Sequence, residues 1–401
     1  MSQNSFTSVS PCLGQNGFKL QRGKQMKNLT QNTVILITLF ATLFSTLVMA
    51  ALPAQAATTT KKVLMVVSGN GQGDKQPGYE FDEFSKAYSV FKNNGIIVDI
   101  ASPQGGQVEA DKYDPSKSYN ARVLVDEAIM AKLNNTLPTN GVDAKAYDAV
   151  FVVGGKGAMF DLPQDTALQN VIAQIYQQHG SVAAVCHGPA ALVNVKLKDG
   201  SYLVANKAIN SFTNQEEKLF GKKWINEFDF MLEDKLSERG ANFQSSEIML
   251  SHVAIDGRLI TGQNPTSTVD VATALVKSLG LTPVNAELSL EDKTLAVVAK
   301  FIAGDKSALE PLINSPEQYL NSFVGVYGFY YLKIANTPLD YEQSLALMLI
   351  GQKDLNNPNI DMKIAKTQLR LGQAVNAKTT LNQLITVKPD FKAAQDMLKT
   401  L

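Results

Sequence analysis

The chain has 401 residues, of which 45% are hydrophobic and 18% charged, which is ordinary for a globular protein and excludes a disordered or collagen-like chain. This length allows one large domain and a smaller one. Lysine plus arginine and aspartate plus glutamate both number 37, so no net charge would attract a polyanion, and we expect no nucleic-acid partner.

The N-terminal segment, residues 1–56, has the pattern of a signal peptide. Basic residues precede an uncharged apolar run from Val34 to Leu52, and the small-residue pattern of a cleavage site follows at Ala54 to Ala56. We therefore expect an exported protein, periplasmic or secreted, with no stable membrane span once the signal is removed. The alternative is an uncleaved membrane anchor, because the apolar run is nearly long enough to cross a bilayer. Met26 precedes a better-proportioned signal than Met1, and either is a candidate translation start.

Residues 61–280 alternate short apolar runs with stretches of helical periodicity. The apolar runs have the length and composition of strands buried on both faces, and helix ends are marked by caps such as Asn94-Gly95. Strand and helix in alternation predict right-handed crossovers, and hence an α/β fold with a doubly wound parallel sheet. We expect strands at 63–67, 96–100, 147–153 and 181–185, a hairpin over 248–261, and helices at 81–94, 168–176 and 264–279.

The segment between Pro103 and Gly141 interrupts this alternation. It is polar and irregular, with turn signals at Asp114-Pro115 and Leu137-Pro138, and it is longer than a connection needs. We expect it to form an inserted loop or a small subdomain over the functional site.

Only helical patterns remain beyond Pro283. The order of apolar and small residues from Leu371 to Ala394 is similar to that of a tetratricopeptide repeat, and a weaker copy precedes it. The alternative is a plain helical bundle. We therefore predict an α/β domain at 57–282 and a small all-α domain at 283–401, the latter a candidate surface for a protein partner.

Cys186 carries the strongest functional signal in the chain. Since Cys12 lies in the predicted signal peptide, the mature chain keeps this one thiol and cannot form an internal disulfide. Cys186 follows an apolar strand and directly precedes a helix start at Gly188-Pro189. Such a turn lifts a side chain above the sheet, as in the nucleophile elbow of hydrolases, and the helix N-terminus should favour the thiolate. The alternative is a small buried apolar residue, which is common for a free cysteine.

Apart from Cys186, the sequence offers few groups for catalysis or metal binding. His187 follows the cysteine and can act as an acid or base. The three histidines, His179, His187 and His252, lack the spacing of metal ligands, and the chain has no GxGxxG fingerprint or P-loop. We therefore predict no metal and no cofactor.

The segment from Ala184 to Ala190, Ala-Val-Cys-His-Gly-Pro-Ala, resembles the nucleophile segment of the DJ-1/PfpI superfamily. Within that superfamily it is most similar to the branch of glutathione-independent glyoxalases and heat-shock-associated chaperones. The resemblance covers roughly residues 61–280, leaves the helical tail unexplained, and implies a flavodoxin-like sandwich. Four further segments lie in the expected order, at 78–83, 147–163, 207–217 and 256–265.

The resemblance implies a role for each of four catalytic candidates. Cys186 corresponds to the nucleophile, His187 to its neighbouring base, and Glu83 to a carboxyl group that hydrogen-bonds the thiol. Glu217 corresponds to the acid that orients the histidine in some members, with Glu216 as the alternative. Each glutamate has a second interpretation as a solvated charge on a helix.

Glycines near the thiol are candidates for binding an oxyanion or substrate. Gly155, after a predicted strand, can offer a backbone amide at close approach, and Gly188 is a second candidate. The chain departs from its relatives at Lys156, where members of this branch often have histidine. A lysine is a compact cation, so the substrate or the pH range is expected to differ.

The resemblance implies a cysteine-dependent, cofactor-free glyoxalase or deglycase that converts small reactive aldehydes of the methylglyoxal class to hydroxy acids. Cys186 would add to the aldehyde as a hemithioacetal, and Glu83 or His187 would move a proton between adjacent carbons. Two alternatives stay open: a Cys-His amidase or peptidase of the same family, and a non-enzymatic, stress-protective chaperone or interaction protein with Cys186 as a redox sensor. A homodimer is a further expectation left open.

Overall fold

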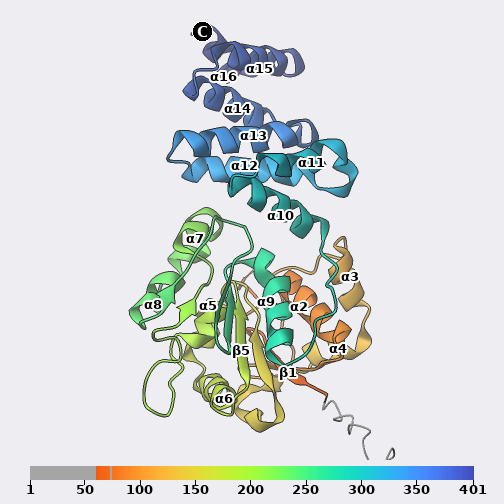
Figure 1. Ribbon diagram of the computed structural model, residues 1–401, viewed down its shortest axis with the longest axis vertical. Helices are drawn as coiled ribbons and strands as arrows, with labels where there is room; N and C mark the ends of the chain where they lie inside the picture. The colour runs from red at the N-terminus through yellow and green to blue at the C-terminus, as the bar shows by residue number, and fades with distance from the viewer. Residues whose placement is uncertain (1–59, 73–74) are drawn as a thin grey trace, which may run out of the picture. The chain divides into compact units, whose positions relative to one another are not determined.

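The computed structural model describes residues 60–72 and 75–401 (Figure 1). The predicted signal peptide lies outside the described residues. Within those residues, none of the helices combines the length and the apolar character needed to cross a bilayer.

The described residues build a seven-stranded sheet in the order β3-β2-β1-β4-β5-β9-β8. All neighbouring strands pair in parallel except β8, which runs antiparallel to β9 in the predicted hairpin. The predicted fold class, a mostly parallel sheet with flanking helices, is therefore confirmed. The strands are β1 Lys62–Val66, β2 Ile97–Ser102, β3 Leu137–Pro138, β4 Ala149–Val152, β5 Ser181–Val185, β8 Val253–Asp256 and β9 Leu259–Gly262, with a separate pair, β6 Ala208–Ile209 and β7 Asn242–Phe243.

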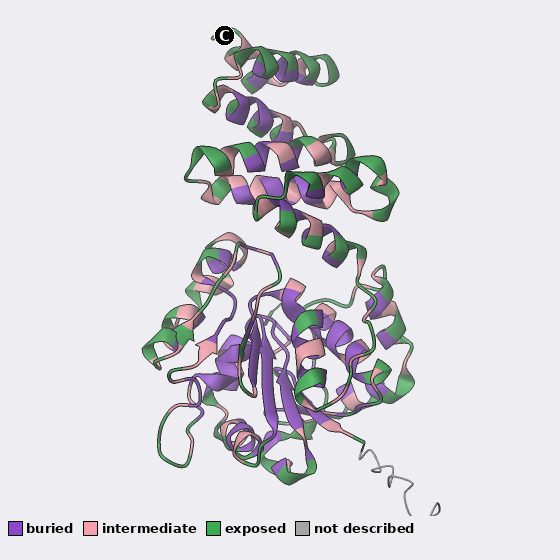
Figure 2. Ribbon diagram, in the orientation of Figure 1, coloured by how far each residue is buried: buried purple, intermediate pink, exposed green. Residues whose placement is uncertain are grey.

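Helices cover both faces of the sheet (Figure 1). Side chains of β1 alternate: Val63 and Met65 pack in the core beneath α2 and α9, whereas Leu64 and Val66 pack in the core beneath α6. The central strands are buried throughout, as Figure 2 shows in purple. The helices are α2 Phe81–Asn93, α3 Ser118–Leu124, α4 Glu127–Leu133, α5 Ala158–Asp161, α6 Thr166–Gln177, α7 Asn214–Phe220, α8 Leu232–Glu238 and α9 Thr268–Ser278.

The segment 103–141 is more regular than its composition indicated. It folds into α3 and α4, and both are tied to α2 by side-chain hydrogen bonds. Asn120 Nδ2 donates to Asp82 Oδ1 at 2.6 Å, and the Tyr88 hydroxyl donates to Asp126 Oδ2 at 3.0 Å. The polar residues that indicated a loop therefore serve as links between helices.

Beyond α9 the described chain is all-helical, as predicted. The pair α12 and α13 approaches closely because glycine faces glycine: a Cβ atom on Gly351 would lie 2.6 Å from the Gly325 Cα. The predicted boundary at residue 283 falls in the connection between α9 and α10, and the tetratricopeptide-like assignment stays a prediction. The helices are α10 Leu290–Ile302, α11 Glu310–Asn314, α12 Asn321–Ile334, α13 Pro338–Leu355, α14 Pro358–Arg370, α15 Ala374–Val387 and α16 Lys392–Leu398.

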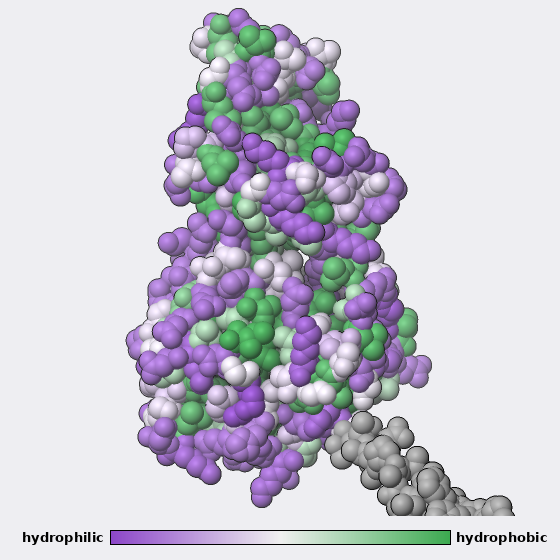
Figure 3. Space-filling model, in the orientation of Figure 1, coloured by the Kyte–Doolittle hydropathy of each residue, from purple (hydrophilic) through white to green (hydrophobic). Residues whose placement is uncertain are grey.

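The face drawn in Figure 3 is largely polar, with apolar side chains gathered in smaller patches between the polar ones. Large apolar side chains that are more than half exposed include Val375 and Val387, both on α15. Scattered exposed residues of this kind are normal on a folded chain.

Candidate active site

Cys186 sits in a sharp turn at the end of β5. Its backbone has a φ of 59°, in the left-handed region that a residue with a side chain seldom adopts. The Cys186 amide donates to the Gly262 carbonyl at 2.9 Å, which holds the turn against β9. A 3₁₀ helix, Gly188–Leu192, follows directly. The strand–turn–helix arrangement predicted for a nucleophile elbow is present, and the strained backbone is typical of such a turn.

His187 connects the thiol to a carboxylate. The Cys186 Sγ lies 3.5 Å from His187 Nδ1, and His187 Nε2 lies 2.8 Å from Glu217 Oε2. Both the histidine and the glutamate are almost fully buried, with side chains 3% and 6% exposed. Because a carboxylate only accepts, it selects the tautomer with a proton on Nε2, which leaves Nδ1 free to accept the thiol proton. The three groups form a Cys-His-Glu relay.

Glu216, the alternative partner for the histidine, has a structural role instead. Its carboxylate accepts a hydrogen bond from the Thr213 amide and completes a capping box at the start of α7. The other oxygen accepts from the Met249 amide at 2.8 Å and from Asn264 Nδ2 at 2.9 Å. Of the two adjacent glutamates, Glu217 therefore serves the relay and Glu216 holds three loops together.

Glu83 lies on the other side of the thiol, fully buried. Its Oε2 accepts a hydrogen bond from the Gly154 amide at 2.8 Å, and its carboxyl group interacts with the Cys186 thiol. A Cβ atom on Gly154 would lie 2.7 Å from Glu83 Oε2 and 2.8 Å from the Cys186 Cβ, so only glycine fits between them. This burial excludes the interpretation of Glu83 as a solvated charge.

The environment of Glu83 and Cys186 opposes ionisation of both groups. Burial raises the pKa of Glu83 well above its ordinary value, with a further rise from the nearby Glu80 carboxylate. Burial also raises the pKa of the Cys186 thiol, and Glu83 raises it further. The expectation that the helix N-terminus favours the thiolate of Cys186 is therefore wrong: the helix is a single short 3₁₀ segment, whereas burial and a neighbouring carboxyl group both oppose ionisation.

The thiol and imidazole open into a cavity of about 290 Å³. Its lining combines apolar side chains with charged and amide groups. Besides Cys186 and His187, the lining residues are Phe212, Phe220, Met249, Pro265, Thr266, Phe323, Glu80, Gly155, Lys156, Glu216 and Asn264.

Of the three candidates for binding an oxyanion or substrate, two line the cavity and one does not. Gly155 and Lys156 line the cavity, and Gly155 has a φ of 95° where a Cβ atom would clash with the Glu80 backbone nitrogen. Gly188 does not line the cavity; it packs against the Val152 carbonyl, where any side chain would clash. Gly155 is therefore placed to offer an amide to substrate, whereas Gly188 allows close packing of the turn.

Glu80 is a functional candidate that the sequence analysis passed over. It precedes α2, it lines the cavity, and its pKa is raised to about 7 by burial and then by Asp82 and Asp111, with Lys156 opposing the rise. In sequence it stands beside two other acids, so it resembles one more surface charge. Lys156 was the signal in the sequence that could have pointed to Glu80, because a partly buried cation is stabilised by a nearby carboxylate.

The segment 103–141, which was expected to lie over the functional site, is placed elsewhere. No residue of the segment 103–141 lines the cavity; the wall is instead formed by Phe220 and Met249 of the α/β region and by Phe323 of α12. As for metals, the described ranges 60–72 and 75–401 contain no cluster of three or more histidine, cysteine or acidic side chains arranged to hold an ion.

Comparisons with known proteins agree with this geometry. The sequence profile described as the DJ-1/PfpI family matches residues 75–278. Glutathione-independent glyoxalase hsp3102 of Schizosaccharomyces pombe is 33% identical over 224 residues, which cover 51% of this chain and 90% of the yeast protein. Among solved structures, the Rapid Encystment Protein 24 kDa of Francisella tularensis is 34% identical, with a TM-score of 0.51 over 55% of this chain and 99% of that one.

A second solved structure, glyoxalase III of Candida albicans, is 25% identical, with a TM-score of 0.50 over 54% of this chain and 97% of that one. In each of these three relatives, the match covers at least 90% of that protein's own length. By its sequence profile, its relatives and its elbow, the chain belongs to the DJ-1/PfpI family.

Proposed function

We propose that this protein is a glutathione-independent glyoxalase that converts 2-oxoaldehydes to 2-hydroxy acids with water and no cofactor. The observation that carries the proposal is the placement of Cys186, which lines a cavity and lies beside both the His187–Glu217 pair and the buried Glu83. Relatives named as glyoxalases support the reaction class.

The first step is addition of sulfur to the aldehyde. The thiol proton passes to His187 Nδ1, the thiolate forms a carbon–sulfur bond to the aldehyde carbon, and the aldehyde oxygen takes up a proton to give a hemithioacetal. Because the resting thiol is protonated, a base at 3.5 Å is needed, and the Glu217 carboxylate stabilises the imidazolium that forms. The Gly155 amide and Lys156 line the cavity where the developing oxygen charge would sit.

The second step moves a proton between adjacent carbons. Glu83 is the group suited to it, since it lies beside the Cys186 thiol and burial raises its pKa, which makes its carboxylate a stronger base than an ordinary one. Glu83 removes the proton from the sulfur-bearing carbon and returns it to the neighbouring carbon, while the hydroxyl proton moves from the oxygen of the first carbon to the oxygen of the second, which converts the hemithioacetal to a thioester of the hydroxy acid. Water then cleaves the thioester and restores the thiol, so no oxidant or reductant is consumed.

Conversion of methylglyoxal and phenylglyoxal to hydroxy acids, without glutathione, tests the proposal in wild type and Cys186→Ala. We expect turnover in the wild type and none in the variant. Ser237→Ala, at an exposed position of α8 outside the cavity lining, is the control and should keep full activity.

Parallel assays with amide and peptide substrates address the amidase or peptidase alternative. Turnover of an amide but of no aldehyde by the wild type would refute the glyoxalase proposal. Aldehyde conversion that survives in Cys186→Ala would refute the role of the thiol.

A further inference from the structure

The helical region supplies part of the wall of the Cys186 cavity. Phe323, on α12, lines the cavity together with Phe220 of α7. Phe220 in turn packs edge-on against Tyr330 of α12, with ring centroids 4.8 Å apart. The aromatic wall of the cavity is therefore built from two segments about a hundred residues apart in the chain.

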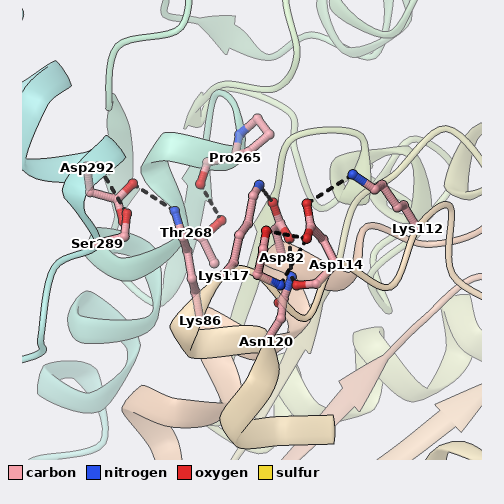
Figure 4. Close-up of polar contacts among 11 residues, drawn as sticks. Asp82, Lys86, Lys112, Asp114, Lys117, Asn120, Pro265, Thr268, Ser289 and Asp292 are labelled. Atoms are coloured by element: carbon pink, nitrogen blue, oxygen red, sulfur yellow. Dashed lines mark hydrogen bonds and ion pairs between the residues drawn. The ribbon is translucent and has the colours of Figure 1, made fainter. Parts of the chain in front are cut away.

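A buried ion pair fixes the start of the helical region to the α/β region. Lys86 Nζ of α2 lies 2.8 Å from Asp292 Oδ1 of α10, and the two side chains are only 9% and 8% exposed (Figure 4). The Ser289 hydroxyl donates to the other Asp292 oxygen at 2.9 Å, which satisfies the carboxylate at the first turn of α10. A buried pair that lost one member would leave an uncompensated charge, so this contact resists separation.

Apolar contacts extend the attachment toward the cavity. Leu250, which is 5% exposed and follows the cavity residue Met249, belongs to the same buried cluster as Leu295 of α10 and Tyr327 of α12. The loop that carries Met249 thus packs against the helix that carries Phe323. The ion pair and these apolar contacts together attach the helical region to the α/β region and keep Phe323 in the lining of the cavity.

The lining of the cavity combines polar and aromatic groups. The thiol, Gly155 and Lys156 offer polar contacts suited to two adjacent carbonyl groups, whereas Phe212, Phe220 and Phe323 offer aromatic surface. A volume of about 290 Å³ has room for roughly ten water molecules. Methylglyoxal is too small to cover these three rings and would leave aromatic surface in contact with water, which is unfavourable; a larger apolar side chain would cover more of it.

We propose that Phe323 makes the C-terminal helical region part of the substrate site and directs the enzyme toward 2-oxoaldehydes whose side chain is apolar and larger than methyl. This inference rests on the proposed function. The helical region then acts as a specificity element for the chemistry that the α/β region performs.

The test is the ratio of kcat/KM for phenylglyoxal to that for methylglyoxal. We expect the wild type to favour phenylglyoxal and Phe323→Ala to lose about tenfold of that preference, with Phe323→Leu intermediate. Phe329→Ala, which shortens another half-buried phenylalanine of α12 outside the cavity lining, should keep the wild-type ratio. An unchanged ratio in a folded Phe323→Ala protein overturns the inference.

A second readout separates this inference from the proposed function. Cys186 is alkylated with iodoacetamide and with its N-benzyl derivative, and the labelled Cys186 peptide is quantified by mass spectrometry. We expect the benzyl reagent to be favoured in the wild type and the preference to fall in Phe323→Ala. If no aldehyde is converted, the proposed function fails while this ratio still decides the role of Phe323; equal ratios in both proteins overturn that role.

Discussion

The α/β region and the helical region contribute to the same cavity by different physical means. The α/β region places its reactive groups through backbone geometry: a left-handed turn at Cys186, a neighbouring histidine, and a glutamate from the first turn of α2. The helical region contributes one aromatic ring, Phe323, and does so only because α12 packs against loops of the other region. Chemistry thus depends on local chain geometry, and selection of substrate depends on tertiary packing.

This contrast predicts that substitutions in the two regions have separable effects. Changes among the buried groups around the thiol should reduce the rate for every substrate. Changes at the attachment of the helical region should alter substrate preference and local stability first. The experiments below are ordered by the size of the expected effect.

Glu83→Gln should have the largest effect. It keeps the shape of the side chain but removes the transferable proton, so aldehyde conversion should fall about a hundredfold or more. Alkylation of Cys186 by iodoacetamide should remain measurable, because the thiol and His187 are intact. Conversion at the wild-type rate would exclude Glu83 as the proton carrier and leave His187 as the base for both steps.

Glu217→Gln should reduce kcat by about thirtyfold for small and large aldehydes alike, because an amide does not select the tautomer of His187 or stabilise the imidazolium. Glu216→Gln is the matched neighbour, one residue away. Because Glu216 holds the loops of Met249 and Asn264, Glu216→Gln should lower the melting temperature by more than Glu217→Gln does and should reduce kcat by less. The reverse pattern would show that the assignment of the two glutamates is wrong.

Those two variants also mark what the sequence could and could not predict. The fold class and the strand 181–185 followed from apolar runs and their alternation with helices, since these signals are local. The groups Cys186, His187 and Glu83 lay in short motifs whose backbone geometry is fixed by neighbouring residues. The resemblance favoured Glu217 and kept Glu216 as the alternative, and it is the position of the histidine ring that distinguishes these two adjacent acids.

Features that depend on distant packing were missed or misplaced. The polar segment 103–141 was expected over the site, but polarity indicates a surface position without indicating which surface. Phe323 carries no local signal at all: its helix has apolar residues on several sides, and nothing in its neighbours shows that one ring reaches a cavity formed mainly by residues 80–266. Gly188 was assigned to substrate when close packing of the turn explains it.

Lys86→Met tests the attachment of the helical region. It leaves Asp292 buried without its partner, so the connection between α9 and α10 should open more often and be cut by protease about tenfold faster. Lys86→Met with Asp292→Leu removes both charges and should restore most of the resistance. Cleavage at the wild-type rate in the single variant would mean that apolar packing alone holds the helical region.

The smallest expected effect concerns Glu80 and pH. Because its pKa is raised to about 7, Glu80 is neutral below that pH and negative above it, and the negative charge raises the pKa of the Cys186 thiol. Glu80→Gln should therefore leave alkylation of Cys186 unchanged at pH 6 and accelerate it about threefold at pH 8. Glu342→Gln, at an exposed position of α13, is the control and should match the wild type at both values.

The same shift predicts a slope in stability. A carboxyl group whose pKa is higher in the folded chain binds more protons there than in the unfolded chain between the two values, so the free energy of unfolding falls as pH rises from about 4.5 to 7. Urea unfolding at pH 5 and pH 8 should therefore show a smaller loss for Glu80→Gln than for the wild type. Equal losses in the two proteins, with equal alkylation ratios, would place Glu80 in contact with solvent rather than in the electrostatic field of the thiol.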